Sequence, residues 1–207
     1  SIIRQLLAQL SSNKIVLAQE GDLPQTLVDA RKQLLFIEKQ LANAKVLPGP
    51  TGESNTLYLE SRGTVNCLRC QDTSFNFWMI SVISALAAGN CVVASVDNLY
   101  FNEVESIANS LLQAGLPAGV FQVAKLGHLP TILNHKSLAG SVVDNNSPFK
   151  KLVGEIVAAR TGAILPLITA YTNESLFNRL VTEKTVTIDT TAAGGNASLM
   201  TMESNIG

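Results

Sequence analysis

Apolar residues recur along this chain in two rhythms. In some stretches they return every three or four residues, which predicts helices with a buried face. In others they alternate with polar residues or run together briefly, which predicts strands. The predicted helices cover residues 2–10, 22–45, 72–90, 99–115, 129–134 and 147–162. The predicted strands of the main pattern cover residues 63–70, 91–96, 120–124, 138–144 and 164–171.

Strands that alternate with helices of this length indicate βαβ units, which build a parallel sheet with helices on both faces. The stretch 72–90 is apolar nearly all round, so we expect this helix to be deeply buried. Two further strands, 55–61 and 184–190, stand outside this pattern and are partly polar. We expect them to pair as a small flap beside the main sheet. The expected fold class is therefore α/β, a doubly wound parallel sheet with a β-flap.

Several residues indicate where these helices begin and end. Asp22 and Ser74 are suitable caps at the starts of two helices, and Ser147 at the start of the last one. Gly89 and Gly115 follow the last periodic positions of their helices and act as stop signals. The stretch "LPGPTGESN" contains too many prolines and glycines for a helix, so we expect a linker or an ordered loop there.

The composition describes a chain with a large core and little surface charge. Hydrophobic residues make up 46% of the 207 residues and charged residues 15%, so we expect part of the surface to face other protein. The length suggests one domain, with or without an appendage. A formal net charge of −1 provides no basic footprint for nucleic acid or for an anionic membrane. No apolar run is long enough to span a bilayer, and no signal peptide is visible.

Three cysteines, Cys67, Cys70 and Cys91, raise the question of redox or metal chemistry. Their odd number, without a secretory signal, favours reduced thiols and a cytoplasmic location. The CxxC motif of Cys67 and Cys70 follows a predicted strand, whereas a redox thiolate is best stabilised at a helix N-terminus. A zinc site needs further ligands, and the chain offers only His128 and His135. Buried structural thiols are the favoured interpretation, ahead of redox or metal chemistry.

Motifs for the common nucleotide and hydrolase sites are missing. The chain contains no GxG, no GK[ST] phosphate loop, no HExxH and no GxSxG. Acidic pairs such as Glu103 and Glu105 have helix-surface spacing, and we interpret them as a solvated face. Residue chemistry alone therefore assigns no catalytic group and no metal site.

The order of two segments along the chain resembles that of a known protein family. "FNFWMISVISALAAGNCVVASVDN", followed by "VESIANSLLQAGLPAGVFQVA", resembles the cofactor domain of the aldehyde dehydrogenase superfamily. In that family a Trp-Asn-Phe-Pro turn leads into a helix that ends in Ala-Leu-Ala-Ala-Gly-Asn, and a later helix ends in Ala-Gly-Leu-Pro-x-Gly-Val. The resemblance implies a Rossmann-like sheet of the aldehyde dehydrogenase cofactor-domain type, whose flap resembles the oligomerisation hairpin of the family.

Several family positions that serve the NAD cofactor differ in this chain. The family lysine that reaches the ribose would fall in "ASVDN", which has no lysine. The Phe-Thr-Gly-Ser turn under the cofactor phosphates is replaced by residues 142–145, so Asp144 brings an anion to the phosphate position. Two like charges ~4 Å apart repel by about 4 kcal/mol at an effective dielectric constant near 20. The resemblance thus implies a degenerate cofactor site without bound NAD.

The catalytic groups of the family are missing as well. The family's general base lies in Leu-Glu-Leu-Gly-Gly, and the aligned residues 165–169 place Pro166 where the glutamate stands. Proline cannot transfer a proton. The family then inserts a catalytic domain with its nucleophilic cysteine, whereas this chain continues almost directly to "LFNRLVTEKTVTIDTTAAGGNASLM". The resemblance therefore implies a domain that has the fold and lacks enzyme activity.

Two further segments resemble a narrower family. "LPGPTGESNTL" at 47–57 and "EKTVTIDTTAAGGNASLM" at 183–200 are similar to the C-terminal domain of long bacterial proline utilization A (PutA) proteins. That family joins an FAD-dependent proline dehydrogenase and an NAD-dependent L-glutamate γ-semialdehyde dehydrogenase on one chain. The resemblance implies that FAD and NAD belong to a parent protein in the cytoplasm, and it leaves open whether that parent associates peripherally with the inner membrane.

The resemblance also implies a division of the chain into three segments. Residues 1–46 would be a helical connecting segment, 47–182 a non-catalytic Rossmann-like domain with a flap strand at 55–61, and 183–207 the second flap strand and a lid peptide. The chain starts at Ser1 and its first methionine is Met79, so we expect a piece of a longer or processed protein.

The lid peptide is small, polar and uncharged, which fits close packing against another backbone. In the family it roofs the dehydrogenase active site and the cavity that joins the two sites, so the partner would be the dehydrogenase domain of the same polypeptide. In isolation the flap would allow self-association. The lid residues are Thr191, Ala192, Ala193, Gly194, Gly195, Asn196, Ala197, Ser198, Leu199 and Met200. From residue chemistry alone, a flexible tail is an open alternative. A free-standing nucleotide-binding protein of the same fold is the alternative function.

Overall fold

The fold is described from a computed structural model, which covers residues 2–12, 23–169 and 172–189. Asp22, the expected cap, and the whole lid peptide 191–200 lie outside these residues. Among the described residues, no helix combines the length and the apolar character needed to cross a membrane.

A parallel five-stranded sheet forms the centre of the molecule, in the order β5-β4-β3-β6-β7. The neighbours of β3 are β4 on one side and β6 on the other, so the chain changes direction across the sheet at this strand. This confirms the doubly wound α/β fold predicted from the alternating pattern. The strands are β3 (Thr64–Arg69), β4 (Cys91–Val96), β5 (Phe121–Lys125), β6 (Leu138–Val142) and β7 (Leu167–Ile168).

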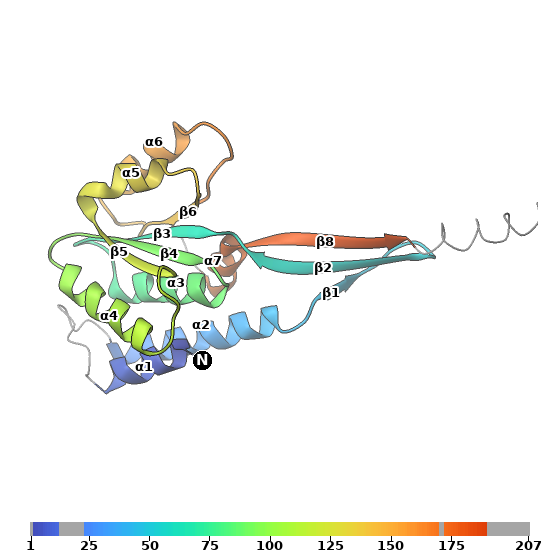
Figure 1. Ribbon diagram of the computed structural model, residues 1–207, viewed down its shortest axis with the longest axis horizontal. Helices are drawn as coiled ribbons and strands as arrows, with labels where there is room; N and C mark the ends of the chain where they lie inside the picture. The colour runs from blue at the N-terminus through green and yellow to red at the C-terminus, as the bar shows by residue number, and fades with distance from the viewer. Residues whose placement is uncertain (1, 13–22, 170–171, 190–207) are drawn as a thin grey trace, which may run out of the picture.

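Helices cover both faces of the sheet (Figure 1). Helices α3 and α4 lie on one face, with α1 and α2 packed outside them as a further layer, and α5 and α6 cover the other face. The helices are α1 (Ile2–Ser11), α2 (Leu23–Leu41), α3 (Phe75–Ala87), α4 (Phe101–Gln113), α5 (Leu129–Asn134), α6 (Lys150–Ala158) and α7 (Asn173–Leu180), with a 3₁₀ turn η1 (Leu126–His128) before α5.

Helix α3 is the most deeply buried helix, as its almost wholly apolar sequence predicts. It lies between the sheet and α2, and α7 also packs against it, so nearly every side of it meets protein. Trp78 and Met79 are both almost completely inaccessible. Ser74 caps its start by accepting a hydrogen bond from the nitrogen of Phe77, and Gly89 ends it at a φ of 85°.

The predicted flap is present as a separate antiparallel sheet, which we call the ribbon. It consists of β1 (Lys45–Leu47), β2 (Glu53–Ser61) and β8 (Val181–Asp189) in the order β1-β2-β8. Strands β2 and β8 pair along their whole length, from Glu53 opposite Asp189 to Ser61 opposite Val181. Figure 1 shows the ribbon extending away from the helices and the parallel sheet.

Some predicted bounds were wrong. Helix α2 ends at Leu41, because the chain then pairs Lys45–Leu47 with β2. Helix α6 begins only at Lys150, because Ser147 joins a turn in which its nitrogen donates to the carbonyl of Asp144. Strand β8 is longer than predicted and begins at Val181, directly after α7, an element that the hydrophobic pattern did not predict.

Candidate functional site

The carboxyl ends of β3 and β6 form the place where a ligand is expected in this fold. In open α/β sheets, ligands bind outside the carboxyl ends of the strands where the strand order reverses. In this chain the loop after β3 leads into α3, and the loop after β6 leads towards α6. The two loops are joined by hydrogen bonds, so the geometry of this crevice is set by the side chains that they contribute.

Asp144 places its carboxylate at the beginning of α3. One oxygen accepts a hydrogen bond from the backbone nitrogen of Ser74 over 3.1 Å, and the other accepts from the backbone nitrogen of Asn146 over 3.0 Å. The residue is 6% exposed. Backbone N–H groups at a helix N-terminus favour an anion, whether it is a phosphate or a carboxylate. The carboxylate of Asp144 therefore already accepts the backbone N–H of Ser74, the residue that caps the start of α3.

Three small side chains of the same two loops pack together, with Cys70 in contact with the other two. The sulfur of Cys70 lies 3.2 Å from the hydroxyl of Thr73 and 3.2 Å from the hydroxyl of Ser147. The hydroxyl of Thr73 also accepts from the backbone nitrogen of Cys70 over 3.2 Å. All three residues are buried. The contact between Cys70 and Ser147 ties the loop after β3 to the loop after β6.

A buried ion pair supports the same loop from the side of α4. The guanidinium of Arg69 lies 3.7 Å from a carboxylate oxygen of Glu103 and 3.9 Å from the ring centre of Tyr100. It also donates to the carbonyl of Thr73. Burial lowers the pKa of Arg69, and the negative charge of Glu103 opposes that shift. The expectation that Glu103 lies on a solvated helix face was wrong, because this carboxylate is the counter-ion of a buried arginine.

Pro166 packs at the beginning of β7, against β6. A side-chain carbon on Gly140 would lie 3.3 Å from the ring of Pro166, so the two residues fit closely because one of them is glycine. The carbonyl of Pro166 accepts from the nitrogen of Ser141 over 3.0 Å. Pro166, which the resemblance aligns with the general base of the family, is therefore a packed ring without an ionisable group.

The cysteines are dispersed. Cys67 lies within β3 and is completely buried, and burial raises the pKa of its thiol from 9.0 to about 12. Cys91 opens β4 at the amino end of the sheet, opposite the crevice. Among the residues that the structure describes, no group of three or more His, Cys, Asp or Glu side chains is placed to hold a metal ion.

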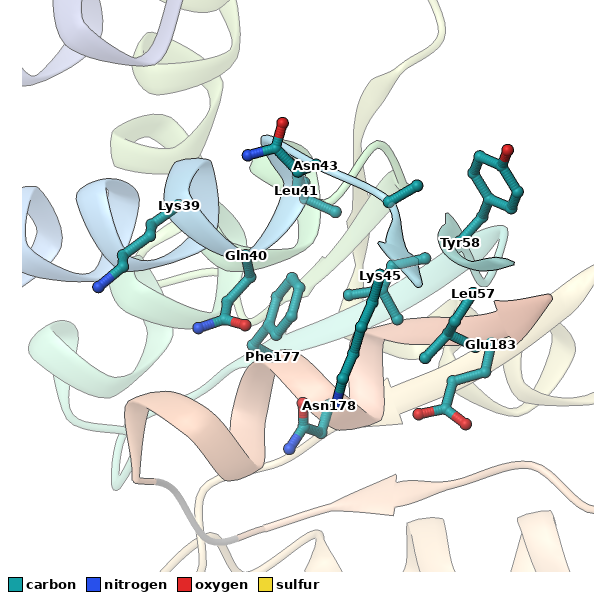
Figure 2. A pocket seen from close by; sticks show the side chains of 12 residues that line it. Lys39, Gln40, Leu41, Asn43, Lys45, Leu57, Tyr58, Phe177, Asn178 and Glu183 are labelled. Atoms are coloured by element: carbon teal, nitrogen blue, oxygen red, sulfur yellow. The ribbon is translucent and has the colours of Figure 1, made fainter. Parts of the chain in front are cut away.

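A separate pocket of about 510 Å³ lies where the ribbon meets α2 and α7. Figure 2 shows Phe177 of α7 inside it, with Lys45 and Glu183 on the side of the ribbon. The sequence pattern does not predict this pocket, because part of its lining comes from β1 and α7, two elements that the pattern missed. Its polar side chains are exposed, and none of them belongs to the crevice at the parallel sheet.

This chain is similar to a broad protein family and to a narrower group of proteins. Residues 5–138 match the Aldehyde dehydrogenase family. The bifunctional protein PutA of Salmonella typhimurium is 32% identical over 165 residues, which cover 79% of this chain and 12% of that protein. The PutA protein of Escherichia coli is 30% identical over 165 residues, with the same coverage. The chain thus corresponds to a small part of the length of these relatives.

Solved structures agree on the fold. A proline utilization A structure described with proline bound in remote sites is 25% identical, with a TM-score of 0.68 over 81% of this chain and 19% of that chain. A putative aldehyde dehydrogenase from Burkholderia cenocepacia is 19% identical, with a TM-score of 0.66 over 80% of this chain and 37% of that chain. At such identity the second likeness concerns the fold alone.

Proposed function

Because the chain belongs to the aldehyde dehydrogenase family, which its residues 5–138 match, we propose that it is a non-catalytic domain of that family in a PutA-type proline-catabolic enzyme. Its role is to cover the semialdehyde dehydrogenase site of the same polypeptide and to close the cavity through which the intermediate passes. The observation that carries the proposal is the carboxylate of Asp144 at the start of α3, 3.1 Å from the nitrogen of Ser74.

The position of the Asp144 carboxylate at the start of α3 argues against dinucleotide binding. A pyrophosphate at the start of α3 would have to displace a carboxylate that already holds two backbone N–H groups. If Asp144 stayed in place, two like charges ~4 Å apart would repel by about 4 kcal/mol at an effective dielectric constant near 20. The packed side chains of Cys70, Thr73 and Ser147 would also have to move apart.

The chain also offers no suitable base or nucleophile at this crevice among the described residues. Pro166 cannot accept a proton, and the thiol of Cys67 is buried with a pKa of about 12, whereas a nucleophilic cysteine needs an accessible thiolate. Cys70 is buried between two hydroxyls, and Cys91 lies at the opposite end of the sheet. In the proposed function, the described residues therefore provide neither an NAD site nor a catalytic group.

The chemistry belongs to the proposed parent enzyme, a cytoplasmic FAD-dependent proline dehydrogenase joined to an NAD-dependent L-glutamate γ-semialdehyde dehydrogenase. The similarity to PutA proteins over 79% of this chain supports this assignment. The partner of the domain is the dehydrogenase domain of the same polypeptide. The lid peptide 191–200 would make the closing contact, and it lies outside the described residues.

The ribbon offers a surface for that partner. Val46 lies opposite Thr56, and Thr56 lies opposite Val186, so both valines are on one face of the sheet. Ile188 and Tyr58 share this face by register. Val46 is 77% exposed and Ile188 is 56% exposed. Exposed apolar side chains on one face of the ribbon are typical of a surface that contacts protein. In the isolated domain the same face would allow self-association.

Deletion of residues 191–207 from the parent enzyme tests the proposed role. Proline oxidation should be unchanged, γ-semialdehyde oxidation should fall, and stopped-flow NADH formation from proline should acquire a lag, because the intermediate escapes. Gly194→Val with Gly195→Val should act in the same direction, since branched side chains prevent close backbone contact. Ala192→Ser is the matched control. A truncated enzyme without a lag and with unchanged dehydrogenase kinetics would refute the lid.

A free-standing nucleotide-binding protein is the alternative function, and it rests on the sheet topology alone. The two functions differ in what the isolated chain should bind. The alternative requires NAD or a related nucleotide to saturate the crevice at the ends of β3 and β6, whereas the proposed function requires no such binding.

A further inference from the structure

The ribbon joins the rest of the domain at a root that is organised around one buried side chain. Strand β2 ends at Ser61 and β8 begins at Val181, and these two residues face each other in the ladder. Asn90 lies immediately before β4 and is 1% exposed. Its carboxamide reaches segments on both sides of the root, which come from opposite ends of the sequence.

The carboxamide of Asn90 uses all of its usual hydrogen-bonding capacity. Its oxygen accepts from the backbone nitrogens of Arg62 over 2.9 Å and of Gly63 over 3.0 Å. Its nitrogen donates to the carbonyls of Ala85 over 3.1 Å and of Leu180 over 2.9 Å. Two donors and one oxygen with two acceptor sites are what an asparagine side chain offers. One side chain thus fixes the end of β2, the last turn of α3 and the residue before β8.

Arg62 adds a second link at the same place. Its guanidinium donates to the carbonyl of Val181 over 3.2 Å, so the residue that follows β2 holds the first residue of β8. Gly63 takes a φ of 128°, which other residues resist, and this turn directs the chain from the ribbon into β3. The ribbon therefore leaves the domain through a hydrogen-bonded root in which Asn90 is the common partner.

Small rotations at such a root become large displacements at the tip. A strand of nine residues spans roughly 30 Å at about 3.3 Å per residue. A rotation of about 10° at the root would move the far end by roughly 5 Å over that length. A surface carried on the ribbon can meet a partner in one orientation only if the root is held firmly.

We propose that Asn90 is a positioning residue that fixes the direction of the ribbon relative to the parallel sheet. The consequence for a partner, that the ribbon reaches the dehydrogenase domain already oriented, rests on the proposed function. The direction of the ribbon in the isolated chain does not rest on it. The two parts are therefore tested separately.

The first test measures the direction of the ribbon in the 207-residue chain. Spin labels at Thr51→Cys, near the ribbon tip, and at Glu105→Cys, on the outside of α4, report one distance across the root in a Cys91→Ser background. The unaltered root should give a narrow distance distribution, and Asn90→Ala should at least double its width at unchanged helix content. Ser81→Ala is the matched control, because it removes a buried hydrogen bond to Phe77 within α3 and leaves the root intact.

A second variant keeps the test decisive if Asn90→Ala does not fold. Asn90→Asp retains an acceptor for Arg62 and Gly63 and loses the donor to Leu180, so the hold on the start of β8 should weaken and the distribution should broaden. A width equal to that of the Ser81→Ala control in the folded variants would overturn the proposal.

The second test places Asn90→Ala or Asn90→Asp in the parent enzyme and measures the lag in NADH formation from proline. A broader distribution together with a lag supports both the positioning role and the docking of the ribbon. A broader distribution without a lag supports the positioning role and counts against the proposed function.

Discussion

A carboxylate oxygen of Asp144 accepts a hydrogen bond from the backbone nitrogen of Ser74, across the two loops that would enclose a ligand. Ser74 is the cap of α3, whose last turn is bonded to Asn90 at the root of the ribbon. The same helix therefore meets an internal anion at one end and supports the ribbon at the other. At the sheet edge where ligands are expected in this fold, the two loops of this chain are joined by hydrogen bonds between their own residues.

The carboxylate of Asp144 should contribute measurably to stability. Asp144→Ala removes both charge-assisted hydrogen bonds and should lower the free energy of unfolding by about 2 kcal/mol. Asp144→Asn keeps one acceptor and loses the favourable charge at the start of α3, so about 1 kcal/mol is expected. Urea unfolding measures both. Asp72→Ala, an exposed carboxylate in the turn before α3, is the control and should change little. Equal stability of Asp144→Ala and wild type would remove this role.

The buried pair of Arg69 and Glu103 should behave as one unit. Arg69→Met leaves the carboxylate buried without its counter-ion and should cost about 3–5 kcal/mol. Adding Glu103→Leu should recover most of this loss, because no charge then stays buried. The exposed pair of Lys184 and Glu60, which are 3.0 Å apart, is the control, and Lys184→Met should cost less than about 1 kcal/mol. Additive losses in the double-mutant cycle would contradict the coupling.

The thiols should differ sharply in reactivity. At pH 8 the folded chain should react with a disulfide reagent at Cys91, which is half-buried, while Cys67 and Cys70 stay protected. In denaturant all three should react. Cys91→Ala should therefore abolish the reaction of the folded protein. Rapid labelling of Cys67 in folded Cys91→Ala would show that β3 opens more easily than its burial implies.

Cys67 should also make stability depend on pH on the alkaline side. Its pKa is raised by burial from 9.0 to about 12, so below pH 9 the thiol is protonated in both the folded and the unfolded chain and has no effect. Between about pH 9 and 12 the Cys67 thiol ionises in the unfolded chain but not in the folded chain. This difference lowers the free energy of unfolding by up to about 1.4 kcal/mol per pH unit. Cys67→Ala should flatten the fall in stability between pH 9 and 10.5, and an unchanged slope would contradict the shift.

Much of the fold could be predicted because local pattern and burial agree. Helix α3 is apolar on all sides and lies between the sheet and α2, and the capping role of Ser74 followed from its place before the apolar run. Strands β2 and β8 were recognised as partners because neither fits the main sheet. The short β1 and α7 were missed. Strand β1 has only three residues and is recognisable only through its pairing with β2.

The site could be predicted only in part. The resemblance placed Asp144 at the phosphate turn of the family's cofactor site, but its bond to Ser74 joins residues that are far apart in the chain. The spacing of Glu103 and Glu105 indicates the surface of a helix. Only the fold brings the guanidinium of Arg69 to the carboxylate of Glu103. Asn90 ends a recognisable motif, "ALAAGN", yet its contact with Leu180 involves α7, a helix that was not predicted.

Isothermal titration of the 207-residue chain with NAD tests the central claim most directly. A catalytically competent aldehyde dehydrogenase of the same family is the positive control, and Asp144→Gly shows whether the internal anion alone excludes the cofactor. The account predicts no saturable binding by wild type through the low millimolar range, a binding free energy weaker than about −4 kcal/mol. It also predicts none by Asp144→Gly, because the contacts of Cys70 with Thr73 and Ser147 still hold the two loops together. A micromolar dissociation constant for the wild-type chain would contradict the account.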